Sequence, residues 1–202
     1  IVGNTPEMVK IKQLIPIINQ LNETVLIQGE HGTGKDLLAR TIHFKSDRQN
    51  MPFVKINIPE MVTIQAEKNK IDAAAGASPR ELDSPQMLLA KANTGTLFLD
   101  EIGALTPRYQ TDLLHFLKDA KSGNSGPDAS DIRLIASTTI NLERLLARGQ
   151  FRKDLYYRLN VIKLGIPPLR TRLEDLAPLT DFFTDRFCHQ LRRSHYELSA
   201  KT

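Results

Sequence analysis

Residues 28–36 read Gln28-Gly29-Glu30-His31-Gly32-Thr33-Gly34-Lys35-Asp36. They follow the apolar run Val25-Leu26-Ile27 and precede a segment with apolar residues at helical spacing. The spacing of Gly29, Gly34 and Lys35 is typical of a loop between a strand and a helix that binds nucleotide phosphates on backbone N–H groups. A glycine turn with an unrelated lysine is the alternative, but the flanking strand and helix patterns favour the phosphate-binding loop.

All members of this loop are candidate nucleotide-binding residues: Gly29, Glu30, His31, Gly32, Thr33, Gly34, Lys35 and Asp36. Lys35 would place its positive charge at the β and γ phosphates. Asp36 stands where a Ser or Thr hydroxyl usually ligates magnesium in such loops. Because a carboxylate can hold the ion directly or through water, Asp36 is also a candidate metal ligand.

Two acidic residues end the apolar run Thr96-Leu97-Phe98-Leu99, which predicts a buried strand. Ligands of open α/β sheets bind at the carboxyl ends of the strands. Asp100 is therefore expected to face Mg²⁺ beside the phosphate loop, and Glu101 to orient or activate an attacking water. Two solvated acids at a strand end are the alternative, which the upstream loop disfavours.

The composition is that of an ordinary globular domain, with 202 residues, 41% of them hydrophobic and 25% charged. A net charge of +4 suits an anionic ligand but is too small to predict nucleic-acid binding. The single Cys188 excludes an internal disulfide and fits a reducing cytoplasm. The sequence has neither an apolar run of about 20 residues nor a signal-peptide pattern, so we expect a cytoplasmic protein with no membrane association. Both ends look cut from a longer chain.

Five predicted strands alternate with helices, which indicates an α/β fold with a parallel sheet. The strands are expected at residues 24–28, 52–58, 96–101, 132–139 and 161–164. Thr139 ends the fourth strand, where its hydroxyl can reach a phosphate or water, although such a threonine is more often structural. Between residues 59 and 95 we expect a helix, an irregular excursion and a return to the sheet. We expect residues 1–167 to form a nucleotide-binding subdomain, and the amphipathic pattern within residues 168–202 to begin a helical one.

The chain resembles the central AAA+ domain of bacterial enhancer-binding transcription regulators, the NtrC-type activators of sigma-54 RNA polymerase. The matching stretches cover nearly the whole chain: Ile1-Val2-Gly3, residues 29–36, Phe53-Val54-Lys55-Ile56-Asn57, residues 95–103, Phe151-Arg152-Lys153-Asp154-Leu155-Tyr156-Tyr157-Arg158-Leu159-Asn160-Val161 and residues 168–175. The segment 151–161 is highly specific to this family. An acidic residue usually follows the loop lysine in these proteins, as Asp36 does here.

This resemblance implies a P-loop NTPase (AAA+) fold that ends in the beginning of a helical lid, with ATP and Mg²⁺ as ligands. The loop glycines and Lys35 would hold ATP, Asp100 the metal ion, and Glu101 the hydrolytic water. Asn57 matches an asparagine that moves against this glutamate and reports the nucleotide state.

Arg152 and Arg158 match the family's arginine fingers, which reach the γ-phosphate bound by the neighbouring subunit. Such an arginine stabilises charge in the transition state, so hydrolysis would require a homo-oligomer, from a dimer to a hexameric ring. An ordinary solvated helix face is the alternative for these two residues.

One surface loop departs from the family pattern. Members that remodel sigma-54 polymerase carry the sequence GAFTGA, and its Phe and Thr make the contact. The corresponding residues 72–77 read Asp-Ala-Ala-Ala-Gly-Ala, so Ala74 and Ala75 replace the two contact residues. Alanine offers almost no area to bury compared with an aromatic anchor. The family's sensor Asn or His is likewise replaced by Thr139.

Three hypotheses follow. In the first, the domain binds ATP and assembles, but acts on promoters without the sigma-54 loop; some such relatives bind cyclic di-GMP near the phosphate loop, and Arg40 is the place to look for that site. The second is a conventional ATP-hydrolysing remodeller of sigma-54 polymerase. The third is a nucleotide-dependent oligomerisation module with little turnover. RNA polymerase holoenzyme, and promoter DNA bound through a domain outside this chain, are the partners that the resemblance implies.

Overall fold

The fold is built on one parallel sheet, seen in a computed structural model that describes residues 1–74, 92, 94–121 and 131–191. Its strands are β1 (Val25–Gln28), β2 (Phe53–Asn57), β3 (Thr96–Asp100), β4 (Arg133–Thr138) and β5 (Ile162–Gly165). They lie in the order β2-β3-β4-β1-β5, and every neighbouring pair is parallel. The α/β fold with five parallel strands, expected from the sequence, is confirmed.

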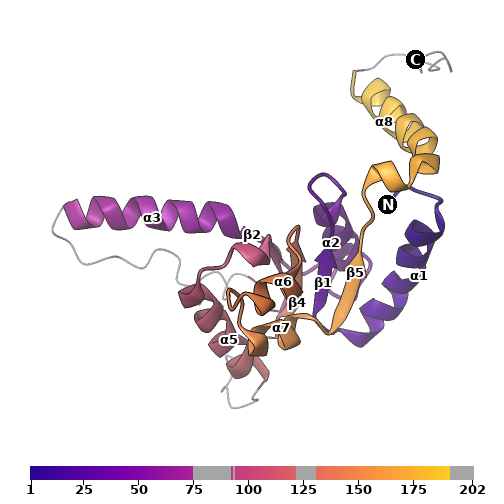
Figure 1. Ribbon diagram of the computed structural model, residues 1–202. Coiled ribbons are helices and arrows are strands. Elements are labelled where there is room, and N and C mark those ends of the chain that lie inside the picture. Colours follow the sequence, from indigo (N-terminus) through magenta and orange to yellow (C-terminus); the bar gives the residue numbers. More distant parts are fainter. Residues whose placement is uncertain (75–91, 93, 122–130, 192–202) are drawn as a thin grey trace.

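Helices flank the sheet (Figure 1). They are α1 (Pro6–Leu21), α2 (Lys35–Phe44), α3 (Ile58–Ala74), α5 (Pro107–Lys121), α6 (Leu142–Ala147), α7 (Lys153–Leu159) and α8 (Leu176–Leu191). The ribbon shows α3 projecting away from the sheet, on the side opposite to α8. None of the helices in the described ranges is both long and apolar enough to cross a membrane.

Alternate residues of the central strands face opposite layers, as the two-residue period of a strand requires. Val25 and Ile27 pack in one core cluster with residues of α1 and α2. Leu26 lies in a second cluster with residues of α5, α6 and α7. Because both faces are covered, the strands read as unbroken apolar runs. Each fully buried Leu or Ile contributes roughly 1.5–3 kcal/mol to folding.

Element boundaries differ from the predicted ones by about one residue, for identifiable reasons. The second strand ends at Asn57 because the Asn57 side-chain oxygen accepts a hydrogen bond from the Glu60 backbone N–H at 3.1 Å, which places Ile58 in α3. The fifth strand is shifted to Ile162–Gly165 by its pairing with β1, in which Val25 is opposite Ile162. Most of the excursion predicted before residue 95 lies outside the described residues.

Asp175, which immediately precedes α8 (Leu176–Leu191), binds the N-terminal segment of the chain. It is 0% exposed, and its carboxylate accepts hydrogen bonds from the backbone N–H groups of Asn4 and Thr5 and from the Thr5 hydroxyl, at 2.5–3.0 Å. A Cβ atom on Gly3 would lie 2.7 Å from this carboxylate. We call this set of contacts the Asp175 clasp. It holds the N-terminal segment beside the turn that precedes α8 (Figure 1).

Candidate functional site

The phosphate loop connects the carboxyl end of β1 to the first residue of α2. Gly32 and Gly34 have φ angles of +75° and +98°, a region that L side chains rarely adopt, and Gly34 is the N-cap of α2. Thr33 closes the turn by donating its hydroxyl to the Glu30 carbonyl oxygen at 2.8 Å. The positive end of the α2 dipole therefore lies at this loop, where it favours an anion.

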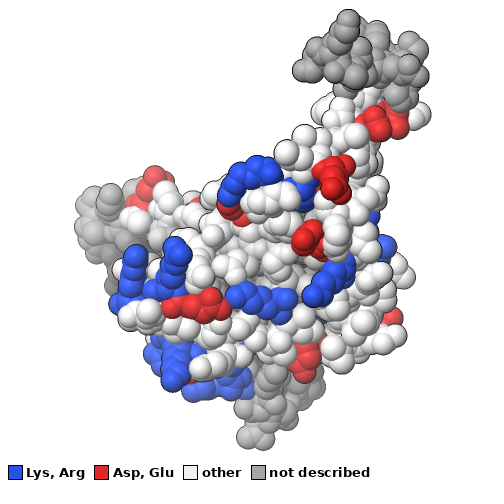
Figure 2. Space-filling model, turned by 45° about the vertical axis from the view of Figure 1, so that its right-hand side comes forward, with Lys and Arg blue, Asp and Glu red and all other residues white. Residues whose placement is uncertain are grey.

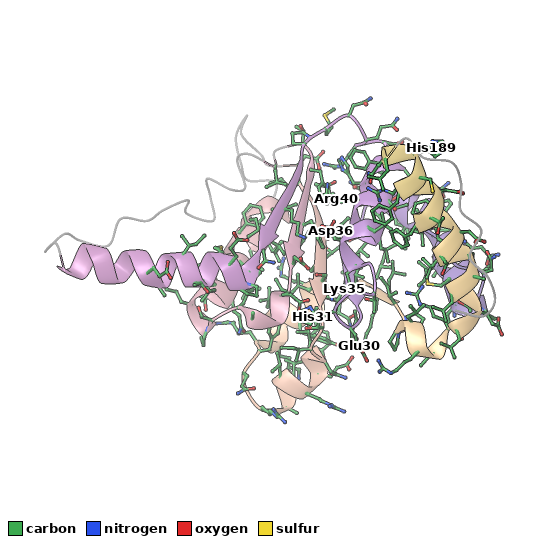
Figure 3. All side chains as sticks on the ribbon, turned by 90° about the horizontal axis from the view of Figure 1, so that it is seen from above. Glu30, His31, Lys35, Asp36, Arg40 and His189 are labelled. Atoms are coloured by element: carbon green, nitrogen blue, oxygen red, sulfur yellow. The ribbon has the colours of Figure 1, made fainter. Side chains whose placement is uncertain are left out.

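Lys35 points back into the loop and is only 7% exposed. Its ammonium group donates to the carbonyl oxygens of Gly29 and Glu30 at 3.0 and 3.1 Å, and it lies 3.1 Å from Glu101 Oε1. Glu30, His31 and Lys35 lie together where β1 meets α2 (Figure 3). A buried ammonium held by neutral carbonyls and one carboxylate is suited to binding a polyanion.

Glu101 lies directly after β3 with φ 61° and ψ 53°, the left-handed region. A non-glycine residue in this conformation costs on the order of 1–3 kcal/mol and is enriched at functional sites. The second carboxylate oxygen accepts from the backbone N–H and the hydroxyl of Thr139, at 2.9 and 2.8 Å. The structure thus brings together three predicted site residues: Lys35, Glu101 and Thr139. Thr139 contacts the carboxylate of Glu101, a partner that the sequence analysis did not name.

Asp36 and Asp100 are brought together by a lysine that sequence reasoning missed. Lys55 Nζ lies 2.9 Å from Asp36 Oδ1 and 3.0 Å from Asp100 Oδ2. Arg40 binds the other oxygen of Asp36 at 2.9 Å, and Ser137 donates its hydroxyl to the other oxygen of Asp100. The sequence did carry a signal for this contact, because Lys55 is a single lysine among the apolar residues of β2.

These contacts shift the pKa values of Asp36 and Lys55. Burial alone would raise the pKa of Asp36, but Lys55 and Arg40 outweigh it and hold that pKa below its ordinary value. Burial alone would lower the pKa of Lys55, whereas its two carboxylate partners raise it above the ordinary value. Both groups are therefore charged near neutral pH.

Asp36 and Asp100 fit a magnesium ion that is bound together with phosphates. Asp36 Oδ1 is a buried oxygen without a hydrogen-bond donor in favourable geometry, although Lys55 lies close to it. Within the described parts of the chain, no cluster of three or more His, Cys, Asp or Glu residues forms a metal cage. Mg²⁺ in nucleotide sites commonly uses one or two carboxylates, with phosphate oxygens and water as its other ligands.

Three other predicted catalytic residues make no contact with the loop in this structure. Asn57 pairs with Asp100 across β2 and β3, but its side chain caps α3. Arg152 is exposed and forms an ion pair with Asp154, which lowers the pKa of Asp154 to about 2. Arg158 donates to the Leu117 carbonyl oxygen at 3.0 Å.

A cavity of about 320 Å³ opens beside the loop. It is lined by residues of the N-terminal segment and α1, the phosphate loop and α2, the segment after β5, and α8: Ile1, Val2, Met8, Ile11, His31, Gly32, Thr33, Gly34, Leu37, Leu38, Ile166, Leu169, Arg172, Leu179, Phe182 and Phe183. Glu30 of the loop also forms a two-point ion pair with Arg170 of the segment after β5, with distances of 2.6 and 2.5 Å. Such a mostly apolar cavity next to an anion site suits a flat ring attached to phosphates.

The strand order, the glycine loop after β1 and the acids after β3 define a P-loop NTPase of the AAA+ class. Residues 1–165 match the family described as Sigma-54 interaction domain, and the chain belongs to this family.

Relatives of this chain carry the names of regulatory proteins. The chain is 40% identical over 193 residues to the HTH-type transcriptional regulatory protein TyrR of Enterobacter agglomerans, covering 94% of this chain and 37% of that protein. It is 39% identical over 203 residues to a Nif-specific regulatory protein of Azorhizobium caulinodans, covering 99% of this chain and 33% of the relative. The chain thus spans about a third of each of these relatives.

Among solved structures, the chain is similar to NtrX of Brucella abortus in complex with ATP. The TM-score is 0.79 and the sequence identity 32%, and the match covers 99% of this chain and 46% of NtrX. A second structure of the same NtrX contains ADP.

Proposed function

We propose that this chain is the ATP-binding AAA+ domain of a bacterial, cytoplasmic, DNA-binding transcription regulator, and that it acts on promoters without the sigma-54 contact loop. The observation that carries the proposal is the position of Lys35. Its ammonium lies inside a glycine loop at a helix N-terminus and is shared with Glu101. The ATP complex of NtrX, which has the same fold, supports ATP as the ligand.

Each side chain has a role that follows from its position. Phosphate oxygens would compete with Glu101 for the Lys35 ammonium, and this exchange would free the Glu101 carboxylate to orient a water. Asp100 and Asp36 would hold Mg²⁺, which supplies positive charge to the phosphates when bound. The adenine ring would occupy the cavity beside the loop, with α8 as the start of the helical lid (residues 168–202).

Hydrolysis is proposed to require a second copy of the chain. Arg152 is exposed on the surface at the start of α7, and its ion pair with Asp154 is a solvent-exposed pair of low strength. Arg158, on the same helix, is held by the Leu117 carbonyl oxygen. Neither contacts the loop of its own chain, so both are assigned to the nucleotide site of a neighbouring subunit in a ring or dimer.

The sigma-54 contact is the part of the family activity that we expect this chain to lack. α3 ends at Ala74, and residues 75–77 of the corresponding loop lie outside the described residues. Alanine at positions 74 and 75 supplies neither the aromatic anchor nor the hydroxyl of the family loop. RNA polymerase holoenzyme is therefore proposed as a partner through another contact. Open-complex formation with purified sigma-54 polymerase tests the alternative, a conventional remodeller.

DNA binding is assigned to a domain outside this chain, in keeping with the name of the HTH-type transcriptional regulatory protein TyrR. Figure 2 shows acidic and basic side chains mixed over the middle of one face. A mixed surface does not attract a nucleic-acid backbone as a continuous basic patch would.

Titration of ATP into the protein tests the proposal, with Lys35→Ala and Lys163→Ala compared. Loss of the charged hydrogen bonds of Lys35 should weaken ATP binding by roughly 100-fold or more. Lys163 pairs with Glu143 on the surface, so its replacement should leave affinity unchanged. Equal affinity in wild type and Lys35→Ala would overturn the proposal.

Cyclic di-GMP belongs in the same titration, because the fold places Arg40 on α2 just after the phosphate loop. Arg40 is held by Asp36 and lies 5.1 Å from the centre of the Phe53 ring. Binding that is lost in Arg40→Ala would identify this ligand; absence of binding removes it. ATP turnover at rising protein concentration separates an assembling ATPase from an oligomerisation module with little turnover.

A further inference from the structure

Lys55 occupies an unusual place for a lysine. It lies in the middle of β2, and its side chain is 33% exposed. Its ammonium group lies 5.6 Å from the centre of the Phe98 ring of the neighbouring strand and reaches two carboxylates at the carboxyl end of the sheet. The apolar stem thus packs on the sheet while the charge is delivered to the site.

One oxygen of each carboxylate interacts with a donor of its own. Arg40 binds one oxygen of Asp36, and Ser137 binds one oxygen of Asp100. Lys55 is the partner that the two acids share, and it interacts with the remaining oxygen of each. These remaining oxygens are the ones that a divalent cation between the two acids would use.

We propose that Lys55 is a positioning residue that acts as the resident counter-ion of Asp36 and Asp100, and that it thereby sets how strongly nucleotide binding depends on magnesium. This inference rests on the proposed function, since it concerns the same site. With Lys55 and Arg40 present, the two negative charges of Asp36 and Asp100 are balanced before any metal arrives, and a divalent cation must compete with the ammonium group for their oxygens.

The charge balance gives the expected direction of each effect. Without Lys55, the two carboxylates repel each other and attract a divalent cation more strongly. A nucleotide without metal is a polyanion, so it meets a more negative site and binds less tightly. A purely structural ion pair would behave differently, because its loss would lower stability without changing the response to magnesium.

The experiment compares wild type, Lys55→Met, Lys55→Arg and the control Lys163→Met. Lys163 is also a strand lysine paired with one carboxylate, but that pair lies on β5 and α6. ADP affinity is measured with magnesium and with a chelator, at matched ionic strength. In Lys55→Met, the ratio of the two affinities should grow by about tenfold or more. Lys55→Arg should restore the wild-type ratio, and Lys163→Met should not change it.

A second measurement needs no nucleotide. Magnesium chloride alone, against sodium chloride of equal ionic strength, should raise the melting temperature of Lys55→Met by several degrees and leave wild type nearly unchanged. If Lys55→Met does not fold, Lys55→Gln, which removes the charge but keeps a polar head, replaces it in both measurements. The inference would be overturned if Lys55→Met kept the wild-type affinity ratio and if magnesium left its melting temperature unchanged. Failure of wild type to bind ADP under any condition would instead overturn the proposed function, and the melting experiment would still decide the role of Lys55.

Discussion

Glu101 is the residue on which the proposed hydrolysis would depend most directly. Its carboxylate links the lysine of the phosphate loop to Thr139 after β4, and its backbone is held in the left-handed region. A side chain fixed at both oxygens is pre-positioned, so little reorganisation is needed once a phosphate takes over Lys35.

Glu101→Gln should retain nucleotide binding and lose turnover by roughly 10²- to 10⁴-fold, because the amide cannot accept a proton from water. Nucleotide affinity and steady-state phosphate release are the measurements. Glu143→Gln, which removes an exposed carboxylate paired with Lys163, is the control and should leave both unchanged. Full turnover in Glu101→Gln would show that the water-activating role belongs to another residue.

At the scale of elements, backbone conformation rather than lack of space limits which residues can stand at the junction between the phosphate loop and α2. A Cβ atom on Gly34 would meet nothing within 4 Å, yet its φ of +98° disfavours any L side chain. Gly34→Ala should therefore destabilise the fold by about 1–2 kcal/mol and weaken nucleotide binding, as measured by urea unfolding and titration. Gly165→Ala is the matched control, since Gly165 also has open space but lies outside the positive-φ region. Similar losses in both variants would contradict the backbone argument.

The Asp175 clasp predicts a specific response to acid. Burial alone would raise the pKa of Asp175, but the hydrogen bonds from Asn4 and Thr5 outweigh it, so the pKa lies below its ordinary value of 3.8. The carboxylate therefore stabilises the fold above about pH 4, and this contribution is lost as the pH falls through the folded-state pKa.

Asp175→Asn should lower the free energy of unfolding by about 2 kcal/mol at pH 7, because it also leaves the buried Arg172 without a carboxylate. The difference from wild type should shrink below pH 4, as followed by urea unfolding over a pH series. Asp47→Asn, at an exposed position, serves as the control. A difference that stays constant down to pH 2 would exclude a role for the Asp175 charge.

At the scale of the whole molecule, the proposed sharing of a site between subunits can be tested by mixing two inactive variants. Arg158→Ala should bind nucleotide normally but lose turnover by about a thousandfold. Lys35→Ala should bind no nucleotide but still offer its Arg158. Mixed at high concentration, the two should recover part of the turnover, measured as phosphate release. Turnover by unmixed Arg158→Ala at the wild-type rate would place this arginine outside the shared site.

The sequence was sufficient for those features that depend on local pattern. The apolar runs of β1, β3 and β4 and the Gly-rich loop predicted the parallel sheet and the place of the site, since the side-chain period and the loop motif are local properties. Glu101 was placed at the site edge for the same reason.

Contacts between segments far apart in the sequence were not predictable in this way. Three such features depend on how side chains point after the chain has folded. They are the contacts of Lys55 with two carboxylates, the Asp175 clasp, and the cavity between the N-terminal segment and α8. The movement of Asn57 against Glu101 stays a prediction. In this structure the Asn57 side-chain oxygen accepts a hydrogen bond from the Glu60 backbone N–H in the first turn of α3.

The projection of α3 has a mechanical consequence. A helix of 17 residues measures about 25 Å, so a tilt of about ten degrees at its base carries its far end through about 4 Å. Asn57 lies at that base, directly opposite Asp100 in the pairing of β2 with β3. A change at the sheet edge that rotates the base of α3 would therefore move the far end of the helix by several ångströms, much further than the residues at the base themselves.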